Sequence, residues 1–211
     1  MKTPTECDWE FPPPHKWPRR DFIVAGADLE PNTVLYAYAH GLFPMYTDGD
    51  LWWWSPIERG IIPIDGFHTS RTLKRSAQKL LCSVNTDFVG VMRACAVTHT
   101  EGQWINEEFI HAYSELHRLG YAHSVEVRTL DGELVGGVYG VRINNFFAGE
   151  SMFHTQTDAS KVALMHLVQL MQLDGMKLLD TQWLTDHLAS LGGTAIPRLE
   201  YLRLLAEAVA E

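Results

Sequence analysis

Beyond Asp65, apolar and polar residues follow regular periods along the chain. Asn106–Leu119 has apolar side chains at every third or fourth position and is followed by Gly120, a pattern that predicts an amphipathic helix. The two-residue period that is typical of strands follows in three segments, Ala122–Arg128, Glu133–Val141 and Phe146–Met152. Short turns at Asp131-Gly132 and Asn144-Asn145 separate these segments, which predicts three consecutive antiparallel strands.

The same reasoning predicts the elements on either side of these strands. Helical spacing is found in Ser70–Leu81, in Asp87–Val97, from Asp158 or Ser160 to Leu173, in a short turn near Thr185–Leu191, and in a last helix begun by Pro197. Cys82–Asn85 is predicted as a strand, and Leu178–Gln182 as a strand parallel to its neighbour because a helix connects the two. This order is that of an acetyltransferase-like (GNAT-type) domain, an α/β (α+β) fold with a mixed, mostly antiparallel sheet.

Residues 1–64 differ from the rest because they are rich in proline, tryptophan and glycine. We expect irregular structure there, with one short helix from about Pro31 to His40. The aromatic side chains around Trp52-Trp53-Trp54 are expected to form a compact core. These differences predict a small N-terminal domain, residues 1–64, and an acetyltransferase-like catalytic domain, residues 65–211.

The composition is ordinary for a globular protein, with 46% hydrophobic and 20% charged residues. No apolar run approaches the roughly 20 residues that span a bilayer, and the first residues lack the apolar segment of a secretory signal. We therefore expect a cytoplasmic protein with no membrane partner, and a monomer because no heptad pattern is present. Since Cys7, Cys82 and Cys95 are far apart and the histidines lack ligand spacing, neither disulfides nor a metal site is predicted.

The net charge of −9 argues against general affinity for nucleic acid, but one segment is strongly basic. The predicted helix at Ser70–Leu81 carries four positive charges and no acid, and the charged residues are Arg71, Lys74, Arg75 and Lys79. Their three- and four-residue intervals place them on the outside of the helix, while leucines face inward. This helix is either an ordinary solvated surface or a surface that contacts phosphates.

The segment Leu178–Gln182 places an acid and an amide where a buried strand would carry aliphatic side chains. Because side chains alternate along a strand, Asp180 and Gln182 are expected to point to the same face. Their separation would allow the amide NH₂ of Gln182 to bond the carboxylate of Asp180, directly or through one water. Such a pair is either a satisfied polar pair in the core or part of an active site.

Signals for phosphate-bearing cofactors are missing. The sequence lacks the G-x-x-x-x-G-K-[ST] pattern, and Gly136-Gly137 lies inside a strand pattern instead of opening a helix. Residues 153–159, where an acetyltransferase would wrap the pyrophosphate of coenzyme A with a glycine-rich turn, contain no glycine. We expect no cofactor and an acyl donor other than acyl-CoA.

Several motifs resemble those of the bacterial leucyl/phenylalanyl-tRNA–protein transferase family over nearly the whole chain. They are Gly41-Leu42-Phe43-Pro44, Trp53-Trp54-Ser55-Pro56, Ala122–Val127, Leu134–Val141, Gly149–Phe153, Asp180-Thr181-Gln182 and Pro197-Arg198. The resemblance implies transfer of Leu or Phe, and less efficiently Met, from Leu-tRNA, Phe-tRNA or Met-tRNA to the α-amine of proteins that begin with Arg or Lys. This modification would mark those proteins for degradation in the N-degron pathway.

The resemblance also implies roles for individual residues. Asp180 and Gln182 would be catalytic, and Glu150 and Thr185 would bind the acceptor. The aminoacyl pocket would be formed by Val138, Phe147, Met152 and Leu179, and the 3′-adenosine would stack on Trp104 and Met45. Phosphates of the tRNA would be contacted by Arg71, Lys74, Arg75 and Lys79. Two positions depart from the family pattern, because better-known members have Trp at Met45 and often Asn at Thr185. An amide oxygen is a very weak base, so we expect Gln182 to position the amine instead of taking up its proton.

Two other functions are compatible with these patterns. The first is an enzyme of the same fold that uses another acyl donor such as acyl-CoA, which detectable binding of coenzyme A would favour. The second is a module without catalytic activity that binds tRNA ends or N-terminal residues, which would bind aminoacyl-tRNA without releasing deacylated tRNA.

Overall fold

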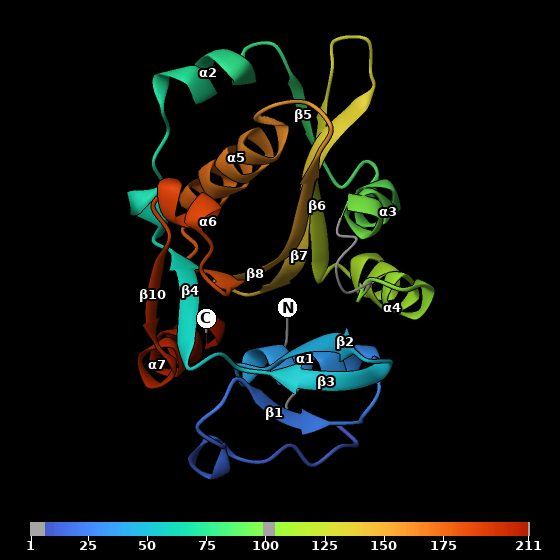
Figure 1. The fold of residues 1–211 in the computed structure, drawn as a ribbon, viewed down its shortest axis with the longest axis vertical. Coiled ribbons are helices and arrows are strands. Elements are labelled where there is room, and N and C mark those ends of the chain that lie inside the picture. Colours follow the sequence, from blue (N-terminus) through green and yellow to red (C-terminus); the bar gives the residue numbers. More distant parts are fainter. Residues whose placement is uncertain (1–6, 99–103, 211) are drawn as a thin grey trace.

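The computed structural model describes residues 7–98 and 104–210, and within these ranges seven strands form one mixed sheet in the order β10-β4-β9-β8-β7-β6-β5 (Figure 1). The strands are β4 (Glu58–Ile62), β5 (Leu81–Val84), β6 (Ala122–Arg128), β7 (Leu134–Ile143), β8 (Phe146–His154), β9 (Leu178–Gln182) and β10 (Thr194–Pro197). Only β8 and β9 are paired in parallel among the strands of this sheet in the described part of the chain. The predicted mixed, mostly antiparallel α/β fold is confirmed.

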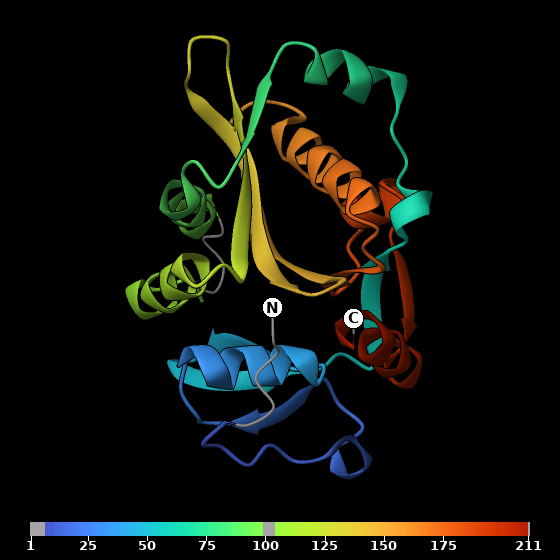
Figure 2. The ribbon, with the colours of Figure 1, turned by 180° about the vertical axis from the view of Figure 1, so that it is seen from behind.

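Helices cover both faces of this sheet. Helix α5 (Ala159–Leu173) lies in the curve of the sheet, whereas α3 (Phe88–Thr98) and α4 (Glu107–Arg118) lie on the opposite face, as both views show (Figures 1 and 2). Neighbouring strand residues accordingly enter different cores: Val138 belongs to the cluster under α5, and Tyr139 to the cluster under α3 and α4. The strand alternation read from the sequence therefore creates two apolar layers around one sheet.

Most elements predicted after residue 65 are confirmed with shifts of one or two residues at their ends. The helix predicted for Ser70–Leu81 is shorter, because it ends at Ala77 and Leu81 begins β5. Asn106 begins α4 and accepts a hydrogen bond from the backbone N–H of Phe109 at 2.8 Å, a typical N-cap. Gly120, with φ of +85°, ends this helix as predicted. The remaining helices are α2 (Arg71–Ala77), α6 (Asp186–Ser190) and α7 (Arg198–Val209).

The prediction of largely irregular structure before residue 64 is wrong. Three strands, β1 (Phe22–Ala25), β2 (Phe43–Thr47) and β3 (Asp50–Trp54), form a second sheet beside α1 (Pro31–Ala39), and single turns of 3₁₀-helix occur at η1 (Pro14–Lys16) and η2 (Ile64–Gly66). Pro44 is compatible with a strand because β2 is an edge of this sheet, where no neighbour needs its missing N–H. The tryptophan run is strand β3, with Trp53 fully buried as the predicted aromatic core requires.

The large sheet also contains two strands that the pattern analysis did not predict. β4 pairs with β9 and β10 with β4, so residues on both sides of position 64 contribute to the same layer of structure. The division of the chain into domains at residue 64 stays a prediction. None of the helices in residues 7–98 and 104–210 could span a bilayer.

The parallel strands β8 and β9 separate at the level of Asp180. Their pairing joins Phe146 to Leu178, Phe147 to Leu179 and Ala148 to Asp180. Beyond this point β9 keeps its partner on the other side, with Gln182 opposite Gly60 of β4, while β8 continues to His154. The gap that opens between β8 and β9 positions the site described next.

Candidate active site

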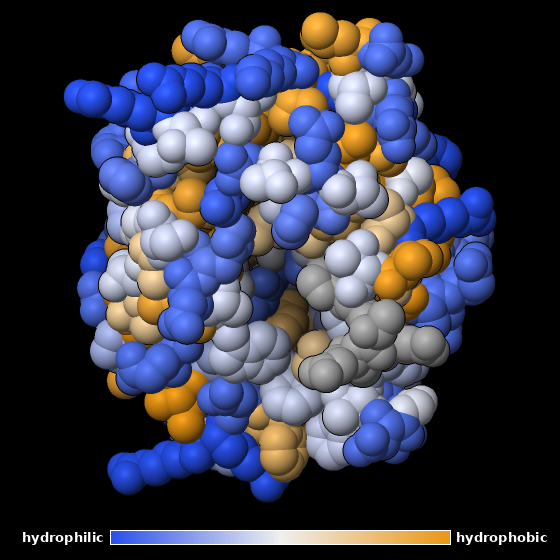
Figure 3. All heavy atoms as spheres, turned by 45° about the horizontal axis from the view of Figure 1, so that its top comes forward, coloured by the Kyte–Doolittle hydropathy of each residue, from blue (hydrophilic) through white to orange (hydrophobic). Residues whose placement is uncertain are grey.

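A cavity of about 480 Å³ lies where β8 and β9 diverge. Its lining includes six residues that the sequence singled out, namely Met45, Trp104, Glu150, Met152, Gln182 and Thr185. Figure 3 shows the molecule hollowed near the centre of the face in view. The cavity is therefore open to solvent and collects side chains from segments that are far apart in the sequence.

Glu150 reaches this cavity because β8 bulges at its position. Tyr139 of β7 pairs with Ser151, and the next residue, Gly140, pairs with Gly149, so Glu150 has no opposite residue on β7. A bulge of this kind redirects the side chain of the extra residue and is frequent beside active sites. The carboxyl group of Glu150 consequently faces the end of β9.

Gln182 meets Glu150 from the other strand. Its side-chain Nε2 donates a hydrogen bond to Oε1 of Glu150 at 3.1 Å. Its backbone has a φ of +58°, in the left-handed region that few residues other than glycine adopt. The backbone N–H of Gln182 donates to Oδ1 of Asp180 at 3.0 Å, so an acid two residues earlier holds this turn.

The predicted direct hydrogen bond between the Gln182 amide and the Asp180 carboxylate is wrong. That prediction assumed regular strand alternation through Gln182, which would place both side chains on one face. The positive φ at Gln182 ends the alternation, and the amide turns to Glu150 instead. Asp180 interacts with the backbone of Gln182 and not with its side-chain amide.

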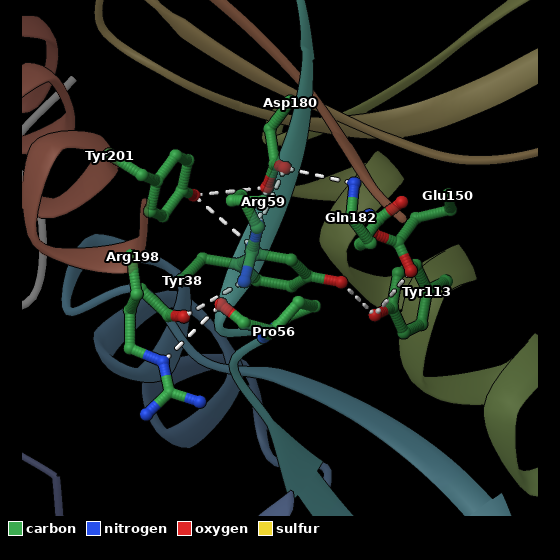
Figure 4. Close-up of polar contacts among 10 residues, drawn as sticks. Tyr38, Pro56, Arg59, Tyr113, Glu150, Asp180, Gln182, Arg198 and Tyr201 are labelled. Carbon is green, nitrogen blue, oxygen red and sulfur yellow. Dashed lines mark hydrogen bonds and ion pairs between the residues drawn. The ribbon is translucent and has the colours of Figure 1, made fainter. Parts of the chain in front are cut away.

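Asp180 is completely buried and lies behind the cavity, where it forms an ion pair with Arg59 (Figure 4). Arg59 donates from Nε to Oδ1 at 2.8 Å and from Nη2 to Oδ2 at 2.6 Å, the two-pronged geometry that matches a carboxylate best. The hydroxyl of Tyr201 donates to Oδ2 at 3.0 Å. Although burial opposes its charge, the carboxylate of Asp180 holds the pKa of Arg59 above its usual value.

Glu150 has a very different environment, since no cation pairs with it in the described part of the chain. Burial raises the pKa of Glu150 to about 8, and the nearby charge of Asp180 acts in the same direction, while hydrogen bonds from Tyr38 and Tyr113 and the charge of Arg59 act against it. The hydroxyl of Tyr113 lies 3.4 Å from Oε2 of Glu150 and 2.6 Å from the hydroxyl of Tyr38. A cation in the cavity would therefore stabilise the ionised form of this carboxyl group.

The four residues expected to form the aminoacyl pocket lie on the α5 face of the sheet. Val138, Phe147 and Leu179 belong to the core under α5, and Met152 packs against this core. Val138 lies opposite Met152, and Phe147 opposite Leu179, in the pairing of the strands. Met152 lines the cavity at Gln182, whereas Val138 and Phe147 line a second cavity of about 400 Å³. Leu179 is fully buried.

The residues expected at the 3′-adenosine, Trp104 and Met45, both line the first cavity. The Trp104 ring packs edge-on against Phe109 of α4, with 5.2 Å between ring centroids. Most of the loop that precedes Trp104, residues 99–103, lies outside the described residues. Thr185 also lines the cavity, and its hydroxyl caps α6 by accepting from the N–H of Leu188 at 3.2 Å.

The first part of the basic segment forms helix α2, while Lys79 lies just beyond its end. Ser70 caps this helix by accepting from the N–H of Leu73 at 3.1 Å. All four basic side chains are exposed, and within the described ranges none of Arg71, Lys74, Arg75 and Lys79 forms an ion pair. Helix α2 is tied to the start of α5, because Ser76 donates to Asp158 at 2.9 Å. These four charges are free to meet an external anion.

Four residues of the buried polar cluster were not predicted from the sequence: Tyr38, Arg59, Tyr113 and Tyr201. Arg59 had a recognisable signal, because it is a charged residue two positions before the apolar pair Ile61-Ile62 of β4. The three tyrosines lie on the apolar faces of helices, where the sequence cannot distinguish a packing role from a polar one.

Comparison with known proteins identifies a family. Residues 61–206 match the family model of leucyl/phenylalanyl-tRNA protein transferase, and residues 27–57 match the model of the N-terminal domain of that protein. A leucyl/phenylalanyl-tRNA–protein transferase of Pseudoalteromonas atlantica is 47% identical over 206 residues, which cover 94% of this chain and 88% of that protein. One of Cereibacter sphaeroides is 50% identical, and the match covers 86% of each chain.

Solved structures with a related arrangement are distant in sequence. FemX aligns with a TM-score of 0.46 and 12% identity over 72% of this chain and 64% of its own. L-PGS from Bacillus licheniformis aligns with a TM-score of 0.45 and 10% identity over 73% of this chain and 65% of its own. Similarity at this level carries no information about activity.

Proposed function

The chain belongs to the leucyl/phenylalanyl-tRNA–protein transferase family, and we propose that it moves Leu, Phe and, less efficiently, Met from the cognate aminoacyl-tRNA to the α-amine of proteins that begin with Arg or Lys. Family membership makes it an aminoacyltransferase that transfers from aminoacyl-tRNA to protein. The choice of amino acids, the acceptor residues and the residue roles below are proposals. The observation that supports them best is Gln182 at the wall of an open cavity, held by two carboxyl side chains.

Gln182 positions the attacking amine. Since Nε2 of Gln182 donates to Glu150, the amide oxygen is the part of this side chain left to accept a hydrogen bond from the amine. The donor is an activated ester, so orientation of the amine against the ester carbonyl contributes most of the acceleration. A free α-amine has a pKa of about 7.7–8.0, so a useful fraction is neutral without a strong base. The proton lost by the nitrogen finally resides on the 3′ oxygen of the released tRNA.

Glu150 faces the positive charge of the acceptor's first side chain. Within the described residues it has hydrogen-bond partners and no cationic one, so an arriving guanidinium or ammonium would supply the missing counter-charge. A single carboxylate attracts a positive charge without requiring a particular geometry of the cation. The site would therefore accept acceptors that begin with either Arg or Lys. Thr185, at the start of α6, lines the same cavity and contributes to acceptor binding.

The donor's side chain enters the apolar space between the sheet and α5. Met152 joins this space to the cavity at Gln182, because it lines the cavity and also packs against the core that contains Val138, Phe147 and Leu179. A difference of one methylene in such a pocket is worth only about 1–3 kcal/mol. The pocket therefore favours Leu, Phe and Met over smaller side chains without excluding them completely.

The tRNA is held by stacking and by charge. Its terminal adenosine stacks on Trp104 and lies against Met45, since exposed bases at single-stranded ends bind to apolar and aromatic side chains. Arg71, Lys74 and Arg75 of α2, together with Lys79 just after this helix, contact phosphates of the tRNA without reading its sequence. A cytoplasmic location, a monomeric state and the lack of a cofactor stay predictions.

One incubation tests this function. The protein is mixed with leucyl-tRNA and a peptide that begins with Arg, and the peptide mass is measured, with an acetylated copy of the peptide as the control. We expect a gain of one leucyl residue on the free peptide and none on the acetylated one. Binding of leucyl-tRNA without a modified peptide would contradict the proposal, and so would transfer from leucyl-CoA but not from leucyl-tRNA.

A further inference from the structure

We propose that Arg59, assisted by Tyr201, is a positioning residue for the transfer: through Asp180 it fixes the left-handed backbone at Gln182 and so directs the Gln182 amide into the cavity. This inference rests on the proposed function of the site. It gives a function to Arg59 and Tyr201, which no sequence pattern had indicated. It also gives Asp180 a positioning role that acts through the backbone of Gln182 and not through its side-chain amide.

The carboxylate of Asp180 is already fully occupied. Its two oxygens accept from Nε and Nη2 of Arg59, from the hydroxyl of Tyr201 and from the backbone N–H of Gln182. A carboxylate offers about four acceptor positions, so none is left for the side-chain amide of Gln182. Any influence of Asp180 on that amide must therefore pass through the backbone of Gln182.

The backbone of Gln182 needs such support. A residue other than glycine, asparagine or aspartate seldom adopts a positive φ unless its surroundings hold it there. The hydrogen bond to Asp180 is one restraint. The other is the close packing of β4 against the residues after Gln182, which Gly60 allows. A Cβ atom on Gly60 would lie 2.7 Å from the nitrogen of Leu184 and 2.8 Å from the carbonyl carbon of Trp183, so only glycine lets β4 pack this closely against the residues after Gln182.

Arg59 anchors Asp180 to the rest of the molecule. Its Nη1 donates to the carbonyl of Gly41 at 3.2 Å, and its Nη2 lies 3.2 Å from the hydroxyl of Tyr201 on α7. The guanidinium carbon lies 4.8 Å from the ring centroid of Phe43 and 4.3 Å from that of Tyr201. Arg59 is fully buried, so it acts on the reaction through Asp180 and not by touching a substrate.

The decisive variant replaces both charges. Removing only Arg59 would leave the charge of Asp180 buried and unpaired, which destabilises proteins strongly. The double change Arg59→Met and Asp180→Leu removes both charges, and well-packed apolar replacements of a buried ion pair are commonly tolerated. We expect this protein to fold and to keep its Kd for aminoacyl-tRNA, while its single-turnover transfer rate falls roughly 100-fold because the amide is misplaced. The matched control, Arg203→Met with Glu207→Leu, likewise replaces an arginine and an acid by Met and Leu, but in an exposed pair, and should transfer at the normal rate.

Hydrogen exchange gives a readout that does not depend on activity. The backbone N–H of Gln182 should exchange slowly in the unaltered protein and much faster in the double variant, since its acceptor is gone. If the double variant fails to fold, Arg59→Lys and Tyr201→Phe take its place, with the expectation of a several-fold loss in rate and faster exchange at Gln182, without a change in Kd for tRNA. A normal transfer rate in a folded protein whose Gln182 N–H has lost protection would overturn the inference. Failure of the unaltered protein to leucylate the peptide would instead overturn the proposed function.

Discussion

The side-chain amide of Gln182 donates to the carboxyl group of Glu150 across 3.1 Å, from strands that separate just before these two residues. One acid thus orients the amide, while a second acid, Asp180, holds the backbone that carries it. The two carboxyl groups differ in their partners: Asp180 pairs with Arg59, whereas Glu150 is bound by neutral donors. Because Glu150 has no cationic partner among the described residues, its ionisation should affect both acceptor binding and the stability of the fold.

Binding of a cationic acceptor should tighten as the pH rises toward 8. Because the pKa of Glu150 is about 8 in the free protein, the carboxyl group must lose a proton to face a cation. N-acetyl-argininamide carries the guanidinium without a titrating α-amine, so its inhibition constant reports this step alone. We expect the constant to fall by up to about tenfold per pH unit below pH 8 and to be independent of pH in Glu150→Gln. A constant independent of pH in the unaltered protein would show that Glu150 does not bind the acceptor's charge.

The same carboxyl group predicts a pH-dependent stability. The raised pKa means that the folded protein keeps a proton on Glu150 which the unfolded chain loses near pH 4.3, so this group's contribution to stability is lost as the pH rises toward about 8. Glu150→Gln removes the titration. Its free energy of unfolding, measured by urea denaturation relative to the unaltered protein, should therefore increase between about pH 5 and pH 8. An equal difference at both pH values would contradict the burial of this acid.

Gly60→Ala should slow the transfer while sparing tRNA binding. The added methyl group would press on the backbone of Trp183 and Leu184, directly after Gln182. Overpacking of this kind typically costs about 1–3 kcal/mol, and a shift of about 1 Å at the amide could lower the transfer rate roughly 100-fold. The measurement is single-turnover transfer together with the Kd for aminoacyl-tRNA. Gly132→Ala lies in an open turn away from the site and strains the backbone there, because the φ of Gly132 is +91°. It is the control for a destabilising glycine substitution that does not press on the residues after Gln182.

Stacking of the terminal adenosine predicts opposite effects at two positions. Trp104→Ala should weaken binding of aminoacyl-tRNA by about 1–3 kcal/mol, the usual contribution of one stacked base. Met45→Trp, which places a second ring at the wall of the same cavity, should strengthen it. Titration of each variant with a fluorescently labelled tRNA measures both. An unchanged Kd for Trp104→Ala would place the adenosine elsewhere.

The basic helix predicts a salt dependence of tRNA binding. Lys74→Gln should reduce the slope of log affinity against log salt by about 0.7–0.9, the value expected for one phosphate contact. Lys177→Gln, an exposed lysine before β9, serves as the control. If both changes alter the slope equally, α2 has no special part in holding the tRNA.

Sequence patterns were sufficient wherever structure is determined locally. The strand Leu178–Gln182 and the helix that begins after Asn106 follow from period, length and capping residues, and both have the predicted bounds within one residue. The short turns between β6, β7 and β8 likewise fixed the antiparallel order. These features depend on residues that are close together in the chain.

The details of the site depend on contacts between distant residues. Arg59 and Asp180 are 121 positions apart, and no local pattern joins them. The left-handed turn at Gln182 depends on that ion pair and on the missing side chain of Gly60, so the strand pattern alone gave the wrong partner for the Gln182 amide. The N-terminal strands were missed for a similar reason, because Pro44 is acceptable only at the edge of a sheet.

The most direct test compares the unaltered protein with Gln182→Asn in a single turnover with leucyl-tRNA and a peptide that begins with Arg. Asn adopts positive φ readily but is one methylene shorter, so the turn is kept and the amide no longer reaches the same point. We expect leucyl-peptide and an equal amount of deacylated tRNA from the unaltered protein. In the variant we expect a rate roughly 100-fold lower with the same Kd for tRNA. Equal rates for the two proteins would contradict the central role of Gln182.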